Sequence, residues 1–147
     1  MGGRFYSLEG IVINRRNFGE ADRLVTVFSR RGGKIILLAP GVRKITSQRG
    51  PKVEFFNLIK TSISRGKTWD ILTEAESKKT FSHLKKDLKR IKTAYQLCEL
   101  TDRFIPEGEE NEAVFDLLLE NLAHLDQEAV FLNFNNFLFQ FKAHLLI

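Results

Sequence analysis

The hydrophobic pattern of this chain changes period after Glu76, and this change constrains the fold most. Before it, apolar residues occur in short runs that alternate with polar ones, and after it they recur about every 3.6 residues. The first period is typical of strands and the second of helices. The sequence therefore predicts an α+β chain, with a β domain over residues 1–78 and a helical domain over residues 79–147.

Turn signals divide the first part into short strands. Arg31-Gly32-Gly33-Lys34 is typical of a tight hairpin, because glycine adopts positive φ without strain. Residues 42–51 are polar, basic and end in glycine, so we expect a long exposed loop there. Five strands at such short intervals are typical of a small closed barrel. The expected strands are residues 5–13, 23–29, 35–39, 53–64 and 69–76.

Three helices are expected in the second part. Pro106-Glu107-Gly108 ends the first helix, Asn111 is a suitable N-cap for the second, and a break near Asp126 precedes the third. The third helix carries a wide apolar stripe that includes Phe131 and Phe141, and the chain ends on three apolar residues, 145–147. This end suggests that the helical domain is incomplete. The apolar face of the first helix is expected to comprise Leu84, Leu88, Ile91, Tyr95, Leu97, Cys98 and Phe104.

Charge is divided between the two parts. Residues 1–92 hold 21 Lys and Arg against 8 Asp and Glu, whereas residues 93–147 hold 2 against 10. A basic β domain of this kind favours a polyanion, and single-stranded nucleic acid is a frequent ligand of small basic barrels. The helical half is acidic, which suggests that it binds something other than a polyanion.

The candidate nucleic-acid contacts are cations at strand ends and in loops, where they can meet phosphates. Arg43, Lys44 and Arg49 of loop 42–51 are the first choice, and a merely solubilising surface is the alternative. A second basic cluster begins the first long helix, where residues 85, 89 and 92 are expected to share a face; a solvated helix face explains it equally well. Phe18 is the best candidate for stacking on a base, followed by Trp69. The predicted DNA-binding residues are Arg43, Lys44, Arg49, Arg15, Arg16, Lys34, Phe18, Lys85 and Lys89.

Several classes of function find little support. The single cysteine, Cys98, lies in an apolar helical stretch, which indicates a buried, inert thiol and excludes a disulfide framework or a multi-cysteine metal site here. The three histidines are far apart and no common catalytic motif is present, so we expect no catalytic residues, no metal, no cofactor and no small-molecule substrate. Neither a signal segment nor a long uncharged apolar run is present, so we expect no membrane association and a cytoplasmic location.

Motifs in register along nearly the whole chain resemble RecO, a bacterial recombination-mediator family. LEGIV at residues 8–12 and NFGEADRLVTVF at 17–28 resemble the opening of that family, and GKI at 33–35 its hairpin. APGVRK at 39–44 with SQRG at 47–50 resembles its basic loop, and LTEAE at 72–76 the end of its barrel. The first long helix with Pro106-Glu107 is also similar.

The resemblance implies a five-stranded antiparallel OB-fold barrel followed by an α-helical domain. It implies binding of single- and double-stranded DNA, strand annealing, and loading of the RecA recombinase in the RecF pathway. The implied partners are a RecR-type mediator protein and single-strand-binding protein, and the implied location is the bacterial cytoplasm, at the nucleoid during repair. Family members often continue into a cysteine cluster that can hold zinc, which this chain lacks. The part played by Arg23 of the EADR motif, in DNA contact or in an ion pair with Glu20 or Asp22, stays open.

Two alternative functions stay open. One is a protein-interaction adapter that docks partners through its Phe-rich, acidic helical half, while the basic half keeps the chain soluble. The other is a generic OB-fold binder of RNA or single-stranded DNA, because a site built on backbone contacts and stacking tolerates either sugar.

Overall fold

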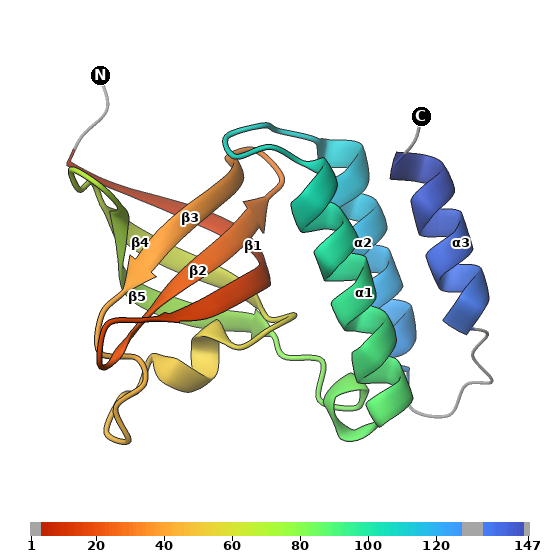
Figure 1. Cartoon of the computed structure of the whole chain (residues 1–147), viewed down its shortest axis with the longest axis horizontal. Helices are drawn as coiled ribbons and strands as arrows, with labels where there is room; N and C mark the ends of the chain where they lie inside the picture. The colour runs from red at the N-terminus through yellow and green to blue at the C-terminus, as the bar shows by residue number, and fades with distance from the viewer. Residues whose placement is uncertain (1–3, 128–133, 146–147) are drawn as a thin grey trace.

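A computed structural model describes residues 4–127 and 134–145, and its first half is a closed five-stranded barrel (Figure 1). The order around the barrel is β1-β2-β3-β5-β4, which confirms the predicted barrel. The strands are β1 (Phe5–Phe18), β2 (Asp22–Ser29), β3 (Gly33–Ala39), β4 (Leu58–Ser64) and β5 (Asp70–Lys79).

The barrel is antiparallel at every pairing except one. Strand β3 pairs with β5 in parallel, through Leu37 with Asp70 and Leu38 with Ile71. One parallel pairing is unavoidable, because five strands cannot alternate in direction all the way around a closed ring. The hairpin between β2 and β3 forms as predicted, with Gly33 at a φ of 73°.

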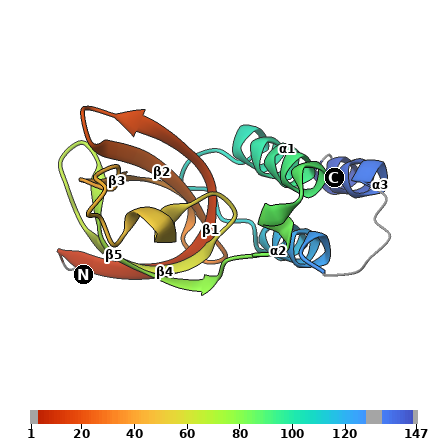
Figure 2. The same ribbon diagram turned by 90° about the horizontal axis from the view of Figure 1, so that it is seen from below.

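The barrel has its own apolar interior, and one end of it is closed by a short helix. The fourth strand begins at Leu58 and not at the expected Val53, which instead ends the 3-10 helix η1 (Gly50–Val53). Pro51 favours η1 by fixing φ near its N-terminus. Figure 2 shows η1 across the barrel opening, where the fully buried Val53 joins the interior residues. That interior consists mainly of Val12, Val25, Val27, Leu37, Ile59, Ile63 and Leu72.

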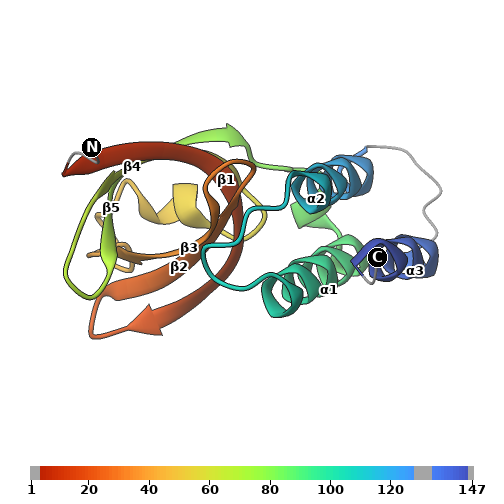
Figure 3. The ribbon, with the colours of Figure 1, turned by 90° about the horizontal axis from the view of Figure 1, so that it is seen from above.

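Three helices follow the barrel: α1 (Leu88–Phe104), α2 (Glu112–Leu125) and α3 (Phe134–Leu145). Figures 2 and 3 show α1 and α2 between the barrel and α3. The second core therefore joins the barrel to the helices, with Ile11 and Phe28 packed in one cluster with Leu97 and Leu118. Asn111 caps α2 as predicted, because its side chain accepts a hydrogen bond from Val114 N at 3.1 Å.

Some expectations for the helices fail or fall outside the described residues. Leu88, Tyr95 and Phe104 were expected on the apolar face of the first helix, yet all three are exposed. Leu88 and Phe104 are the more exposed of the three, whereas one side of the Tyr95 ring still contacts Phe55 and Phe56. Phe131 and the apolar end at residues 146–147 lie outside the part of the chain that the structure describes.

The start of α1 also differs from the prediction. Residues Leu84–Lys86 form a separate 3-10 turn, η2, and the extended Asp87 then caps α1 by accepting from Lys89 N at 2.9 Å. The single face predicted for residues 85, 89 and 92 is therefore wrong at Lys85, because Asp87 breaks the helical period.

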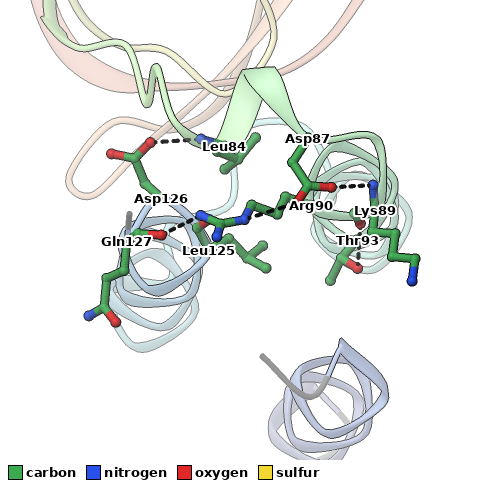
Figure 4. A network of polar contacts seen from close by, with 8 residues as sticks. All are labelled: Leu84, Asp87, Lys89, Arg90, Thr93, Leu125, Asp126 and Gln127. Carbon is green, nitrogen blue, oxygen red and sulfur yellow. Dashed lines mark hydrogen bonds and ion pairs between the residues drawn. The ribbon is translucent and has the colours of Figure 1, made fainter. Parts of the chain in front are cut away.

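Arg90, within the basic segment at the start of α1, is buried (Figure 4). Its guanidinium donates to the carbonyl of Leu125 at 3.0 Å and to that of Gln127, and it pairs with Asp87 at 3.3 Å. A cation is favourable at the C-terminal end of α2, where carbonyl groups lack helical partners. Arg90 thus ties the start of α1 to the end of α2.

Candidate nucleic-acid interface

Four cations from three segments line one polar pocket of about 400 Å³ at the end of the barrel. Arg15 comes from β1, Arg23 from β2, and Arg43 and Lys44 from the loop after β3. The β1–β2 hairpin places Arg15 opposite Val25, so Arg23 lies only two positions further along the neighbouring strand. A concave surface with converging positive charge suits a phosphate or another anion.

The loop after β3 is held against the β1–β2 hairpin by hydrogen bonds. The carboxylate of Asp22 accepts from Gly41 N at 2.7 Å, and the carbonyl of Ala21 accepts from Arg43 N at 2.9 Å. The Arg43 side chain also donates to the carbonyl of Gly19 at 3.1 Å. The EADR segment therefore fixes where Arg43 and Lys44 lie, although both side chains are exposed.

Arg49 belongs to the same loop but is only partly exposed. Its guanidinium donates to the carbonyls of Pro40 at 2.6 Å, Leu72 at 3.1 Å and Thr73 at 3.3 Å. These contacts anchor the loop to β5. The structure therefore gives this predicted DNA contact an anchoring role in the fold.

The cations of the pocket lie close enough to influence one another. Burial, together with the positive charges of Arg15 and Arg43, lowers the pKa of the Arg23 guanidinium, while Glu54 opposes this shift. Within residues 4–127 and 134–145, Arg23 forms an ion pair with neither Glu20 nor Asp22. Its Nε donates to the Asn17 side chain at 3.4 Å. A bound anion would relieve the mutual repulsion of these side chains.

Phe18 and Trp69 form an aromatic pair next to this pocket. Their ring centroids lie 6.4 Å apart in an edge-to-face arrangement, and Phe18 is 41% exposed. Phe18 precedes Gly19, whose carbonyl holds Arg43, so the aromatic pair and the pocket lie side by side. The two stacking candidates from the sequence thus come together in space, with Phe18 at the end of β1.

The other predicted cations lie in different surroundings. Arg16 and Lys89 are exposed. Lys85 donates to the Asn57 side chain and lies 3.7 Å from the Glu54 carboxylate, while burial lowers the pKa of its ammonium against the opposing effect of Glu54. Lys85 therefore does not line the pocket itself but contacts Glu54, which does.

Lys34 is removed from the pocket. It lies near the start of β3, whereas the basic loop follows the end of that strand. Its buried ammonium donates to the carbonyl of Asp102 at 2.8 Å and pairs with the Asp102 carboxylate at 3.0 Å. Lys34 thus joins the barrel to α1.

A larger and more apolar cleft of about 590 Å³ is lined by residues of both the barrel and α2. Leu8, Ile35, Phe115 and Leu119 line it, and Arg30 at its edge pairs with Asp116 at 2.6 Å. It shares no lining residue with the basic pocket.

Within the described residues, no three His, Cys, Asp or Glu side chains gather in a way that could hold a metal ion. Cys98 is fully buried as predicted, and burial, with the charge of Asp102, raises the pKa of its thiol far above the usual range. None of the helices within residues 4–127 and 134–145 is long and apolar enough to cross a membrane.

Sequence reasoning missed Glu54 and left Arg23 undecided. The pairing of β1 with β2 brings Arg23 beside Arg15, so the hairpin signal at residues 17–22 could have indicated it. Glu54 enters through the turn after η1, for which the sequence gives no comparable signal.

Comparison with known proteins matches the barrel and the helical part of the chain to two parts of one family. Residues 1–81 match the family model "Recombination protein O N terminal", and residues 85–146 match "Recombination protein O C terminal". The chain is 37% identical over 119 residues to the DNA repair protein RecO of Pelotomaculum thermopropionicum, covering 81% of this chain and 46% of that protein. It is 37% identical over 125 residues to RecO of Gloeobacter violaceus, covering 85% of this chain and 48% of that protein. The chain thus spans about half the length of these relatives. By its barrel, its helices and these matches, the chain belongs to the RecO family of DNA repair proteins.

Proposed function

We propose that this chain binds single- and double-stranded DNA, without catalysing a reaction, and promotes annealing of complementary strands. The convergence of Arg15, Arg23, Arg43 and Lys44 in one pocket supports this most strongly. Exposed Arg16 and Lys89 add positive charge, and Phe18 with Trp69 supplies an aromatic surface beside the pocket. A basic surface that holds two strands together screens their repulsion and raises their local concentration.

We propose further that this chain acts in recombinational repair in the bacterial cytoplasm. We propose that it helps RecA to replace single-strand-binding protein on DNA, together with a RecR-type mediator protein. The RecO family membership supports these partners. In this arrangement the barrel supplies DNA contact, while the helices and the part of such proteins beyond this chain supply partner contact.

A salt series tests the DNA-binding proposal. Fluorescence anisotropy of a labelled single strand is measured against this chain, and a complementary strand is added afterwards. About four phosphate contacts predict that affinity falls roughly 50-fold between about 50 and 200 mM salt. Binding that is weak at every salt concentration, with no faster annealing, would contradict the proposal.

The matched variants are Arg43→Ala with Lys44→Ala in the pocket, and Lys78→Ala with Lys79→Ala at the end of β5 as a control of equal charge. All four side chains are exposed. We expect the pocket pair to lower affinity about tenfold or more and the control pair to lower it about twofold or less. Equal effects would mean that total charge, and not the pocket, determines binding.

A further inference from the structure

Three aromatic rings meet where the barrel joins α1. The ring centroid of Tyr95 lies 4.7 Å from that of Phe55 and 5.1 Å from that of Phe56, while Phe55 and Phe56 are 5.9 Å apart. Phe56 is buried, Phe55 is half-buried and Tyr95 is 43% exposed. The inner part of the cluster is therefore buried, and its outer surface is open to solvent.

An unusual backbone conformation builds this cluster. Phe56 has a φ of 75°, which is strained for a bulky residue, and its N–H donates to the carbonyl of Val12 at 2.9 Å. The turn lets two consecutive side chains both reach Tyr95 instead of pointing to opposite sides, as they would in a strand. Strain held in place by surrounding structure is frequent at binding sites.

The cluster continues directly from the basic pocket. The Arg15 guanidinium lines the pocket and also lies 5.5 Å from the centre of the Phe55 ring. Glu54, the neighbour of Phe55, lines the pocket as well. On α1, exposed Lys92 lies three residues before Tyr95 and so on the same face of the helix. A chain of cation, aromatic surface and cation thus runs from the barrel onto α1.

We propose that Phe55 and Tyr95 form a stacking platform for a base of a single strand that leaves the basic pocket, and that Lys92 meets a phosphate beside it. The proposal rests on the proposed function and extends the DNA path from the barrel to the helical half. Every base offers a π face, so the platform would hold a strand without reading its sequence. Removing one stacking partner of this kind lowers affinity by about 5- to 150-fold.

Tyr95 could instead serve only to pack α1 against the barrel. These two roles differ in their dependence on bases. If Tyr95 only packs, its replacement should change the affinity for a strand with bases and for a strand without bases equally. If Tyr95 stacks, only the affinity for the strand with bases should fall. A base-dependent loss of affinity therefore identifies stacking.

The test compares Tyr95→Leu with Tyr95→Phe, since leucine keeps an apolar side chain and phenylalanine keeps the ring. Anisotropy is measured with an oligothymidine of about 30 nucleotides and with an abasic strand of the same length, which has the phosphates but no bases. We expect Tyr95→Leu to weaken oligothymidine binding at least about fivefold and abasic binding less than about twofold. Tyr95→Phe should bind both strands as the unaltered chain does. Thermal unfolding of both variants confirms that they are folded.

Each other result overturns the inference. If Tyr95→Leu weakens both strands equally, or neither, the path does not use the Tyr95 ring. If it weakens neither while Arg43→Ala with Lys44→Ala still loses binding, the proposed function stands and only the platform is wrong. If the unaltered chain binds neither strand, both proposals fail.

Discussion

Among single residues, Glu54 is the one whose removal should strengthen DNA binding. Its carboxylate lines the pocket of cations and lies 3.7 Å from the Lys85 ammonium. A phosphate entering the pocket must compete with this internal anion for the same positive charges. We expect Glu54→Gln to bind a single strand about three- to tenfold more tightly, with a salt dependence steeper by about 0.7 in log–log slope. Anisotropy across a salt series measures both.

The same substitution should lower stability slightly, because the cations of the pocket then repel one another with less compensation. The Glu54 side chain is 48% exposed, so solvent screens this effect and the loss in free energy of unfolding should stay below about 0.5 kcal/mol. Glu74→Gln is the matched control, since it removes an equal charge from an exposed position on β5 outside the pocket. If both variants gain the same affinity, general charge and not competition at the pocket is responsible.

Among the elements, loop 42–51 contains two kinds of residue: some anchor the loop to the barrel, and others are exposed to solvent and could contact DNA. Arg49 donates three side-chain hydrogen bonds to main-chain carbonyls, whereas Lys44 is exposed. We expect Arg49→Ala to lower the free energy of unfolding by about 2 kcal/mol, because three partly buried hydrogen bonds to a charged donor are lost. Arg43→Ala with Lys44→Ala should change it by less than about 1 kcal/mol, while it weakens DNA binding. Urea unfolding measures the first effect and anisotropy the second.

Arg49→Lys distinguishes the two roles of Arg49. Lysine keeps the positive charge but cannot place several donors in the planar fork that reaches Pro40, Leu72 and Thr73 at once. If Arg49 acts through its geometry, this variant should be nearly as unstable as Arg49→Ala. A stable Arg49→Lys variant with reduced DNA affinity would instead assign Arg49 to direct contact.

Local patterns predicted the elements, and long-range contacts decided the roles of the charged residues. The barrel strands, the hairpin at Gly33 and the Asn111 cap follow from alternation, glycine and capping, which act within a few residues. The burial of Arg90 depends on carbonyls 35 and 37 positions away, which no local pattern contains. Lys34 looks like a hairpin cation in the sequence, and its partner Asp102 lies 68 residues further on. Sequence therefore showed where positive charge is abundant but not which cations converge.

At the scale of the whole molecule, the basic and acidic parts of the chain are joined by a buried polar contact. Asp102 of α1 accepts hydrogen bonds from Lys34 of β3 at 3.0 Å and from Asn14 of β1 at 3.2 Å. The loop between α1 and α2 is fixed to the same strand, because Gly108 N donates to the carbonyl of Lys34 at 2.7 Å. These contacts and the shared apolar core fix the barrel relative to α1, which the platform at Phe55 and Tyr95 requires.

Breaking the Lys34–Asp102 pair should therefore cost stability without touching the basic pocket. We expect Asp102→Asn to lower the free energy of unfolding by about 2–4 kcal/mol, because the largely buried Lys34 ammonium loses its counter-charge. Glu99→Gln is the control on the same helix: its pair with Arg103 at 2.7 Å is exposed on both sides, so the loss should be below about 0.5 kcal/mol. Urea unfolding compares the two variants.

DNA binding gives the second half of this test, because Lys34 has either a structural or a DNA-contacting role. Lys34→Met with Asp102→Leu removes both charges and keeps apolar volume at the junction, which should recover much of the stability lost by Asp102→Asn. If Lys34 only joins the barrel to α1, this double variant binds a single strand as tightly as the unaltered chain when both are fully folded. A stable double variant with weakened binding would instead place Lys34 on the path of the DNA, and the interface would then extend to both ends of β3.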